Sequence, residues 1–399
     1  MDLTKEMKET IRLYDEDAYG VEFDARVIGC RRKADDADNL YELELDRTLF
    51  FPEEGGQSPD KGRIDGADVL DVQIRNGVII HTVNQPIEVG MQVHGEIDWN
   101  HRFSNMQQHS GEHIFSGLVH SRFGFDNVGF HLSDQIVTMD FNGVLTAKDV
   151  EEVEDAVNEA IAKNVEIVVT YPSKEELKNL EYRSKIEIEG QVRIVTVTGY
   201  DVCACCAPHV RRTGEIGMLK VMSVQNYKGG VRISILCGFR ALMAFREKAA
   251  VIDELTSMFT CGQEMLVDNI AKQKSLNQTL KSELGSAKMQ LMDYRLAEIP
   301  EDMQDVILFE RDLDMNVVRA AVNKLTETRE GVVALFVGDD ESGYNYIVGS
   351  KTVDCREIAA GMKEELAARG GGSNRMIQGS LGATRENLKQ FLKKFTESR

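Results

Sequence analysis

The stretch QQHSGEHIFSG, residues 107–117, decides how the rest of the chain is interpreted. It places His109 and His113 four residues apart, and on an α-helix residues with this spacing lie on one face about one turn apart. Two imidazoles in that arrangement can bind one metal ion. Apolar residues around them repeat at helical spacing and predict a helix packed on a core: Phe103, Met106, Ile114, Leu118 and Val119.

A second stretch, CACCAPHVRRTGEIG at residues 203–217, offers the remaining ligands. Cys205 and His209 provide one thiolate and one imidazole, which suit zinc. Together with the helical pair they would form a His3Cys site. Either pair alone is a weak signal, and the spacing also permits Cys203 or Cys206 as the thiolate.

Several segments resemble the editing half of alanyl-tRNA synthetase and its free-standing relatives, the AlaX proteins. RTLFFPEEGGQSPDKGRI, residues 47–64, is similar to the glycine-rich motif of that family, with Glu54 in place of a glycine. Asp98 and Arg102 fit the Asp-x-x-x-Arg that precedes the family's metal helix. KGGVRISILCGFRA, residues 228–241, is similar to the strand that ends the editing domain.

The cysteine stretch resembles the family's Cys-Gly-Gly-Thr-His-Val motif, of which it keeps Cys205 and His209. It departs from the motif at residues 206–208, where Cys-Ala-Pro replaces Gly-Gly-Thr. The resemblance covers nearly the whole chain and implies a long-form AlaX protein with a C-terminal DHH-associated domain. Within the resemblance nothing corresponds to the aminoacylation domain, so a full synthetase is not expected.

The resemblance implies a trans-editing hydrolase that deacylates tRNA(Ala) mischarged with serine or glycine. Zinc would be bound by His109, His113, Cys205 and His209, and the partners would be the acceptor end and the elbow of tRNA(Ala). Gln57, in the glycine-rich loop, is a candidate for lining the catalytic pocket.

Glu112 is a second catalytic candidate because it lies between the two helical histidines. It invites comparison with the base of HExxH metalloproteases, although the order in this chain is HSGEH. The simpler alternative is a carboxylate on the helix surface.

Composition indicates a globular protein of several domains, since 42% of the 399 residues are hydrophobic and 28% are charged. No apolar run approaches the length of a membrane helix, and residues 1–10 lack the apolar core of a signal peptide, so a cytoplasmic location is expected. A net charge of −19 argues against a general nucleic-acid binder. Basic side chains nevertheless outnumber acidic ones between residues 211 and 300. This basic excess could form an RNA contact, or it could be a solvated helical face.

The expected fold is an α+β multidomain chain in four parts. The first three are a β-barrel-like glycine-motif module at residues 1–95, an α+β zinc-binding editing domain at 96–240, and a helical coiled-coil spacer at 241–299. The fourth is a small α/β DHH-associated tRNA-binding domain at 300–399.

The spacer carries a seam of residues at alternating intervals of four and three between Leu266 and Tyr294, which is apolar except at Gln273 and Asn277. This seam predicts a long helix over residues 245–297 that buries its seam in a coiled coil, an intramolecular hairpin or a homodimer. Gly262 and Gly285 are the positions at which that helix could break or bend.

In the last part, residues 306–309 and 332–337 are predicted to be short buried strands. The glycine run at residues 370–372 resembles the DHH-associated domain. By itself it would be a plain loop, or a turn whose N–H groups bind phosphate.

A second class of function stays open at this point. A set of four protein ligands is typical of structural zinc, so the chain could be a non-catalytic tRNA- or partner-binding protein. The sequence does not separate serine from glycine as the group removed, because one small group changes binding by only about 1–3 kcal/mol.

Overall fold

The computed structural model describes residues 9–33, 39–184 and 190–396. The chain divides into two compact units, unit 1 at Met1–Asp253 and unit 2 at Glu254–Arg399, and each is described by itself. The interpretation of residues 1–10 as lacking a signal core rests mostly on residues 1–8, which lie outside the described ranges. In those ranges no helix is both long and apolar enough to cross a membrane.

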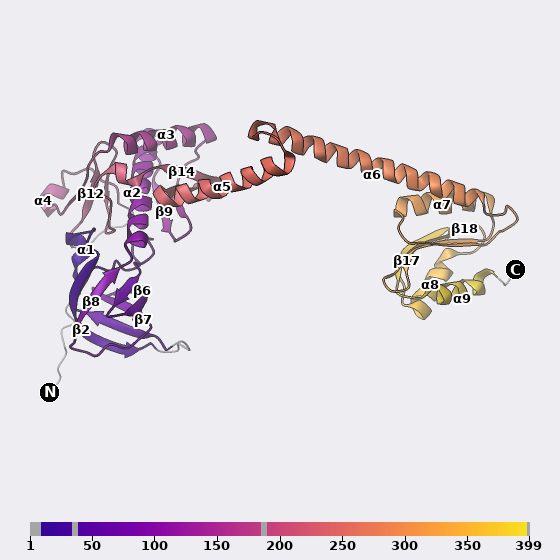
Figure 1. The fold of residues 1–399 in the computed structure, drawn as a ribbon, viewed down its shortest axis with the longest axis horizontal. Helices are drawn as coiled ribbons and strands as arrows, with labels where there is room; N and C mark the ends of the chain where they lie inside the picture. The colour runs from indigo at the N-terminus through magenta and orange to yellow at the C-terminus, as the bar shows by residue number, and fades with distance from the viewer. Residues whose placement is uncertain (1–8, 34–38, 185–189, 397–399) are drawn as a thin grey trace. The chain divides into compact units, whose positions relative to one another are not determined.

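Unit 1 begins with six strands that close into a barrel. Their order is β2-β3-β7-β6-β5-β8. Figure 1 labels β2, β6, β7 and β8 among them. Along β2 the residues alternate between buried and exposed, so Phe23, Ala25 and Val27 fill the interior. Asn76 and Gly77 join β6 to β7 with positive φ at both residues, which a two-residue hairpin turn of type I′ requires. The strands are β2 (Glu22–Arg32), β3 (Tyr41–Leu45), β5 (Gly62–Ile64), β6 (Ala67–Arg75), β7 (Val78–Val83) and β8 (Gln92–Ile97).

Helix α2 (Trp99–Phe123) follows the barrel. Asp98 caps it by accepting a hydrogen bond from the backbone N–H of His101, and Gly124 ends it in the left-handed conformation. From Asn105 to Val119 every residue is buried, so the helix is surrounded by protein instead of presenting a single apolar face.

A four-stranded sheet of order β14-β15-β10-β9 packs with α2 and α3 (Ala147–Lys163) around one core. A three-stranded sheet of order β11-β12-β13 completes this layer. Its last strand packs on α2 and leads into the cysteine stretch. The strands are β9 (Asn127–Leu132), β10 (Val137–Phe141), β11 (Ile167–Thr170), β12 (Ile194–Val197), β13 (Asp201–Ala204), β14 (Leu219–Tyr227) and β15 (Gly230–Cys237).

Short elements complete unit 1. β1 pairs with β4 in parallel beside the barrel. The 3-10 helix η1 packs on α2 and α3. Their bounds are β1 (Ile11–Arg12), α1 (Leu13–Glu16), β4 (Arg47–Thr48), α4 (Lys174–Leu177) and η1 (Thr213–Ile216).

The prediction of one helix over residues 245–297 is wrong, because the chain forms two helices there. α5 (Gly238–Phe259) ends before Thr260, whose φ of 50° is left-handed. The 3-10 helix η2 (Gln263–Met265) then leads from Gly262 into α6 (Leu266–Ala297). Gly262 therefore marks the break, whereas Gly285 lies inside α6 without interrupting it.

The apolar seam of α6 is largely exposed. The exposed fractions are 53% for Leu280, 57% for Leu291 and 74% for Tyr294. The side chains that α6 buries against α7 (Met315–Thr328) are instead Met292 and Leu296. The seam thus lies on a different face of the helix from its contact with the rest of unit 2.

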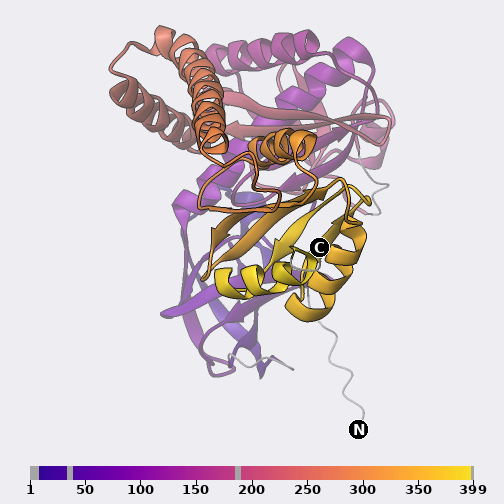
Figure 2. The same ribbon diagram turned by 90° about the vertical axis from the view of Figure 1, so that its right-hand side faces the viewer.

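Unit 2 contains a five-stranded sheet of order β16-β17-β18-β20-β19. Figures 1 and 2 show α7 over one face of this sheet and α8 with α9 over the other, and each face has its own core cluster. The predicted strands at 306–309 and 332–337 are confirmed. The elements are β16 (Val306–Glu310), α7 (Met315–Thr328), β17 (Val332–Asp339), β18 (Gly343–Ser350), α8 (Cys355–Leu366), β19 (Arg369–Gly372), β20 (Met376–Leu381) and α9 (Arg385–Thr396).

The sheet of unit 2 is mixed, because only β16 and β17 are parallel and the other pairs are antiparallel. The glycine run at residues 370–372 is neither the loop nor the turn expected from the sequence. It belongs to edge strand β19, and a Cβ at Gly370 would lie 2.2 Å from the carbonyl oxygen of Gln378, so glycine permits this close pairing.

Candidate metal centre

Four predicted ligands meet in unit 1. One donor atom each from His109, His113, Cys205 and His209 lies within 4.8 Å of the others. Cys205 Sγ is 3.6 Å from Nε2 of His109 and 3.4 Å from Nε2 of His209. α2 supplies the first two residues, and the loop after β13 supplies the others.

A buried hydrogen bond holds the second nitrogen of each imidazole. Nδ1 of His109 is 2.7 Å from Oε1 of Gln57, and Nδ1 of His209 is 3.0 Å from Oγ of Ser110. Nδ1 of His113 is 2.9 Å from a carboxylate oxygen of Asp201. When Nδ1 carries the proton, Nε2 keeps its lone pair, which is the form that binds a metal.

The surroundings favour Cys205 over its neighbours as the thiolate. Burial opposes ionisation of the Cys205 thiol, but the nearby His109 and His209 outweigh it and hold its pKa well below the usual range. Burial raises the pKa of Cys203 to about 11 and also raises that of Cys206. Among the described residues, neither of those two belongs to the four-donor group.

Burial also acts on the imidazoles. It lowers the pKa of His209 to about 3. For His113 burial acts in the same direction, but hydrogen bonds to Asp201 and Cys205 outweigh it and raise the pKa well above its usual value. Metal binding at this centre would therefore displace a proton from the ligand set.

Gln57 reaches the centre from the barrel. Its glycine-rich loop fits under β9 because Gly56 has a φ of 84°, and a Cβ there would lie 2.4 Å from the carbonyl oxygen of Phe130. The Gln57 side chain is fully buried, with Oε1 used by His109. Within the described ranges its Nε2 has no hydrogen-bond partner.

Glu112 is only 2% exposed, so the alternative of a helix-surface carboxylate is wrong. Its Oε1 accepts hydrogen bonds of 2.6 Å from the hydroxyl of Ser116 and from Nδ2 of Asn127. It is not part of the four-donor group. The residue lies three positions after His109 and directly before His113 but is engaged in a separate polar network.

Sequence reasoning missed Asp201 and Arg183, which lie directly behind His113. Asp201 is 88 residues from that histidine along the chain. Two hydrogen bonds from the guanidinium of Arg183 hold its carboxylate. No short motif joins these three residues, although Asp201 is close in sequence to the cysteine stretch.

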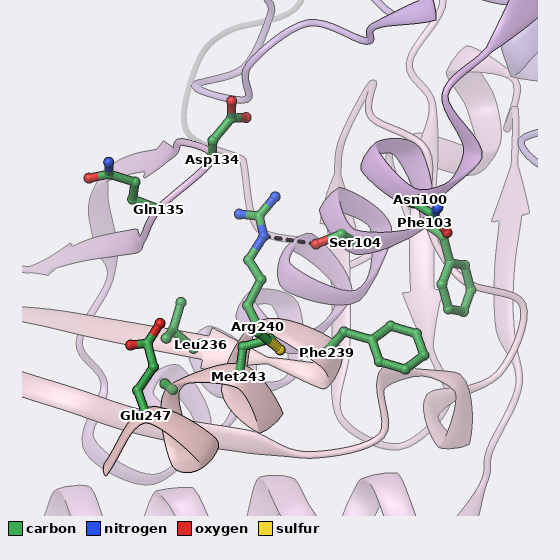
Figure 3. A pocket seen from close by; sticks show the side chains of 11 residues that line it. Asn100, Phe103, Ser104, Asp134, Gln135, Leu236, Phe239, Arg240, Met243 and Glu247 are labelled. Atoms are coloured by element: carbon green, nitrogen blue, oxygen red, sulfur yellow. Dashed lines mark hydrogen bonds between the residues drawn. The ribbon is translucent and has the colours of Figure 1, made fainter. Parts of the chain in front are cut away.

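A cavity of about 600 Å³ lies at the N-terminal end of α2, where α5 packs beside it (Figure 3). Phe103, Phe239 and Met243 form much of its apolar wall. Arg240 crosses its floor and donates hydrogen bonds to Ser104 and to a backbone carbonyl. None of the four donor residues lines this cavity.

Three families match separate parts of the chain. Residues 4–101 match "tRNA synthetases class II (A)", and residues 192–234 match "Threonyl and Alanyl tRNA synthetase second additional domain". Residues 302–398 match the "DHHA1 domain". The second match includes Cys205 and His209, and the third covers most of unit 2.

Curated relatives extend over most of the chain. "Alanyl-tRNA editing protein AlaX-L" of Pyrococcus horikoshii is 26% identical over 94% of this chain and 96% of its own length. "Alanyl-tRNA editing protein Aarsd1" of Danio rerio is 26% identical over 91% and 92%. "Alanine--tRNA ligase" of Ignicoccus hospitalis is 30% identical over 91% of this chain, which spans only 40% of that enzyme.

The two editing proteins thus match more than nine-tenths of this chain and of their own length, whereas the chain spans only 40% of the ligase. The matched domains occur in the order in which the fold presents them: barrel, metal centre and C-terminal sheet. Over more than nine-tenths of its length the chain is similar to proteins named alanyl-tRNA editing protein, AlaX-L and Aarsd1.

Proposed function

We propose that this chain is a trans-editing hydrolase that deacylates tRNA(Ala) mischarged with serine or glycine. The observation that carries the proposal is the meeting of His109, His113, Cys205 and His209 in a chain whose full-length relatives are named alanyl-tRNA editing proteins. The ester between an amino acid and the tRNA 3′ end is on a flexible single strand, so it can reach a buried centre.

Zinc is the ion that this donor set suits best. With a Zn–S distance of about 2.3 Å and a Zn–N distance of about 2.0 Å, a tetrahedral ion separates its sulfur and nitrogen ligands by about 3.5 Å. The Cys205 Sγ distances of 3.6 and 3.4 Å to two imidazole nitrogens agree with this value. A thiolate with three neutral imidazoles also excludes magnesium and calcium, which prefer oxygen ligands.

A bound zinc would supply a Lewis acid beside the ester. The part played by the chain itself centres on Gln57, whose Nε2 donor is buried, unpartnered among the described residues and next to His109. We propose that this amide donates a hydrogen bond to the ester carbonyl oxygen as negative charge develops on it. The bonds of Glu112 to Ser116 and Asn127 favour a structural role for that residue.

The alternative is a non-catalytic tRNA- or partner-binding protein with a structural zinc. Four protein donors support it, since they can fill a tetrahedral site without leaving a position for substrate or water. Hydrolysis at this centre therefore requires one ligand to give way or the coordination to expand.

Other parts of the chain suit the proposed partners. We propose that residues 302–398, which match the DHHA1 domain, contact the elbow of tRNA(Ala), as the family resemblance implies, and that the metal centre receives the acceptor end. We propose that the exposed seam of α6 pairs with a second copy in a homodimer, because Leu280, Leu291 and Tyr294 leave a row of apolar side chains in solvent. The proposed location is the cytoplasm, where tRNA is charged.

The proposal is tested by deacylation kinetics with Ser-, Gly- and Ala-tRNA(Ala). The zinc-loaded chain should hydrolyse the first two and spare the third. Gln57→Met should lower kcat/KM by about 10²–10³-fold, as expected for loss of one oxyanion donor. The matched control is Gln73→Met, which changes a barrel glutamine bonded to Glu53 and Asp71 and should leave the rate unchanged. No hydrolysis of any of the three would favour the non-catalytic alternative.

A further inference from the structure

We propose that Asp201 is a positioning residue of the metal centre: it fixes the tautomer and orientation of His113, and Arg183 in turn fixes Asp201. This inference rests on the proposed zinc site and extends it to two residues outside the ligand set. It also assigns a role to the charges buried behind α2.

The three side chains form a continuous chain of hydrogen bonds. Nδ1 of His113 lies 2.9 Å from Oδ2 of Asp201. Nε of Arg183 donates to Oδ1 at 2.7 Å, and Nη2 donates to Oδ2 at 2.9 Å. The exposed fractions of the side chains are 2% for His113, 2% for Asp201 and 14% for Arg183, so water has little access to the chain of bonds.

His113 differs from the other two imidazoles in the charge of its partner. His109 and His209 bond to neutral groups, the amide of Gln57 and the hydroxyl of Ser110. The carboxylate of Asp201 can only accept, so it holds the proton on Nδ1 of His113 and leaves the lone pair on Nε2. A negative partner also makes the imidazole a stronger metal ligand than a neutral partner does.

The backbone is arranged to bring Asp201 close to α2. Gly117 lies one turn after His113, and a Cβ at Gly117 would approach Asp201 Cβ to 2.8 Å and the carbonyl oxygen of Tyr200 to 2.4 Å. Any larger residue would separate β13 from the helix. Glycine at this position therefore allows the short contact between the carboxylate and the imidazole.

Backbone hydrogen bonds attach Arg183 to β13, the strand that contains Asp201. Its N–H donates to the carbonyl oxygen of Val202 at 2.8 Å, and its carbonyl oxygen accepts from the N–H of Ala204 at 2.9 Å. These bonds pair Arg183 with β13 on either side of Cys203. The backbone of Arg183 is thus fixed beside β13, and its guanidinium balances the negative charge of the buried Asp201 carboxylate.

A different role for the same residues is a second metal site, since donor atoms of His113, Asp201 and Cys203 lie within 4.8 Å of one another. Both oxygens of Asp201 are already engaged by Arg183, and Oδ2 also bonds to His113. A metal cation between these three residues would have to displace the Arg183 guanidinium, which is also positively charged. The geometry therefore favours positioning over a second ion.

Asp201→Asn tests the proposal, because it removes the charge and keeps the shape. Zinc affinity of the full chain, measured by competition with a chromophoric chelator, should fall about 10- to 100-fold. The control is Asp140→Asn, which breaks a bidentate pair with Arg232, at 2.6 and 2.7 Å, that does not include a histidine. The control should bind zinc with unchanged affinity.

A second measurement needs no variant and applies even if Asp201→Asn fails to fold. In zinc-loaded protein labelled with 15N at its histidines, His113 should carry its proton on Nδ1, shifted downfield by the carboxylate. A proton on Nε2 of His113, or Asp201→Asn with the affinity of the wild type, would overturn the positioning role alone. A wild-type chain that binds no zinc would overturn the metal site as well.

Discussion

Arg102 and Asp60 form an ion pair in which both side chains are fully buried. Arg102 stands in the first turn of α2, and Asp60 follows the glycine-rich loop of the barrel. Nε of Arg102 lies 3.0 Å from each carboxylate oxygen, and its other nitrogens donate to the carbonyl oxygens of Ala18 and Leu49. The pair therefore joins the barrel, which carries Gln57, to the helix that carries two metal ligands.

Removing one member of this pair leaves a buried charge without its partner. We expect Arg102→Met or Asp60→Asn to lower the free energy of unfolding by about 3–5 kcal/mol. Urea denaturation of zinc-loaded protein measures this loss in the free energy of unfolding. The exposed pair of Arg63 and Asp68, 2.9 Å apart on the barrel, is the control, and Arg63→Met should cost less than about 1 kcal/mol. Equal losses in both pairs would contradict the account.

Metal analysis distinguishes the three clustered cysteines. The wild type should hold one zinc per chain, and Cys205→Ala or His109→Ala should remove it, because the other donors cannot complete the site. Cys203→Ala and Cys206→Ala should retain a full equivalent, since neither thiol belongs to the four-donor group. Full retention of zinc in the His109→Ala, Cys205→Ala double variant would exclude the assigned ligands.

His81 predicts a pH dependence of stability that is separate from the metal centre. Its ring is fully buried in the barrel between Thr48 and the carbonyl oxygen of Leu43, and burial lowers its pKa from 6.5 to about 4. Between these values the unfolded chain binds a proton that the folded chain does not, so stability falls as the pH falls.

This group should lower the free energy of unfolding by roughly 3 kcal/mol between pH 6.5 and 4. In His81→Gln that part of the dependence should be absent, whatever the other histidines contribute. Denaturant midpoints of the two proteins across this range supply the comparison. Parallel pH profiles would show that His81 binds a proton in the folded barrel as readily as in the unfolded chain, and would contradict this prediction.

Sequence patterns predicted the parts of the site that depend on local spacing. His109 and His113 share a helix face, and Cys205 and His209 share one loop, so each pair was visible as a motif. Asp201 reaches His113 only through the packing of β13 on α2. No spacing within the sequence encodes that contact.

The helical region illustrates the same limit. The four-three repeat correctly predicted a helix from Leu266 but extended it backward across the turn at Thr260, whose left-handed φ no apolar pattern reveals. Gly285 does not interrupt α6, because an isolated glycine in a helix costs only about 1 kcal/mol and no other atom lies within 4 Å of a Cβ placed there. The glycine run at 370–372 pairs with β20 at a distance that glycine permits, because a Cβ at Gly370 or Gly372 would lie 2.2 Å from a carbonyl oxygen of β20.

The exposed seam of α6 leads to a prediction about assembly. If it pairs two copies, the wild type should sediment as a dimer and Leu280→Asp as a monomer, since a carboxylate in the seam opposes burial. Ser282→Asp, on an exposed position of the same helix, should remain dimeric. Monomers in every case would assign the seam to a contact within one chain.

The most direct test of the account is single-turnover deacylation of Ser-tRNA(Ala) by the full chain before zinc removal, after it, and after reloading. Hydrolysis should be lost with the metal and restored by one equivalent of zinc, while the circular dichroism spectrum remains that of a folded protein throughout. An unchanged rate in the folded, zinc-free protein, or no hydrolysis by the fully loaded one, would contradict it.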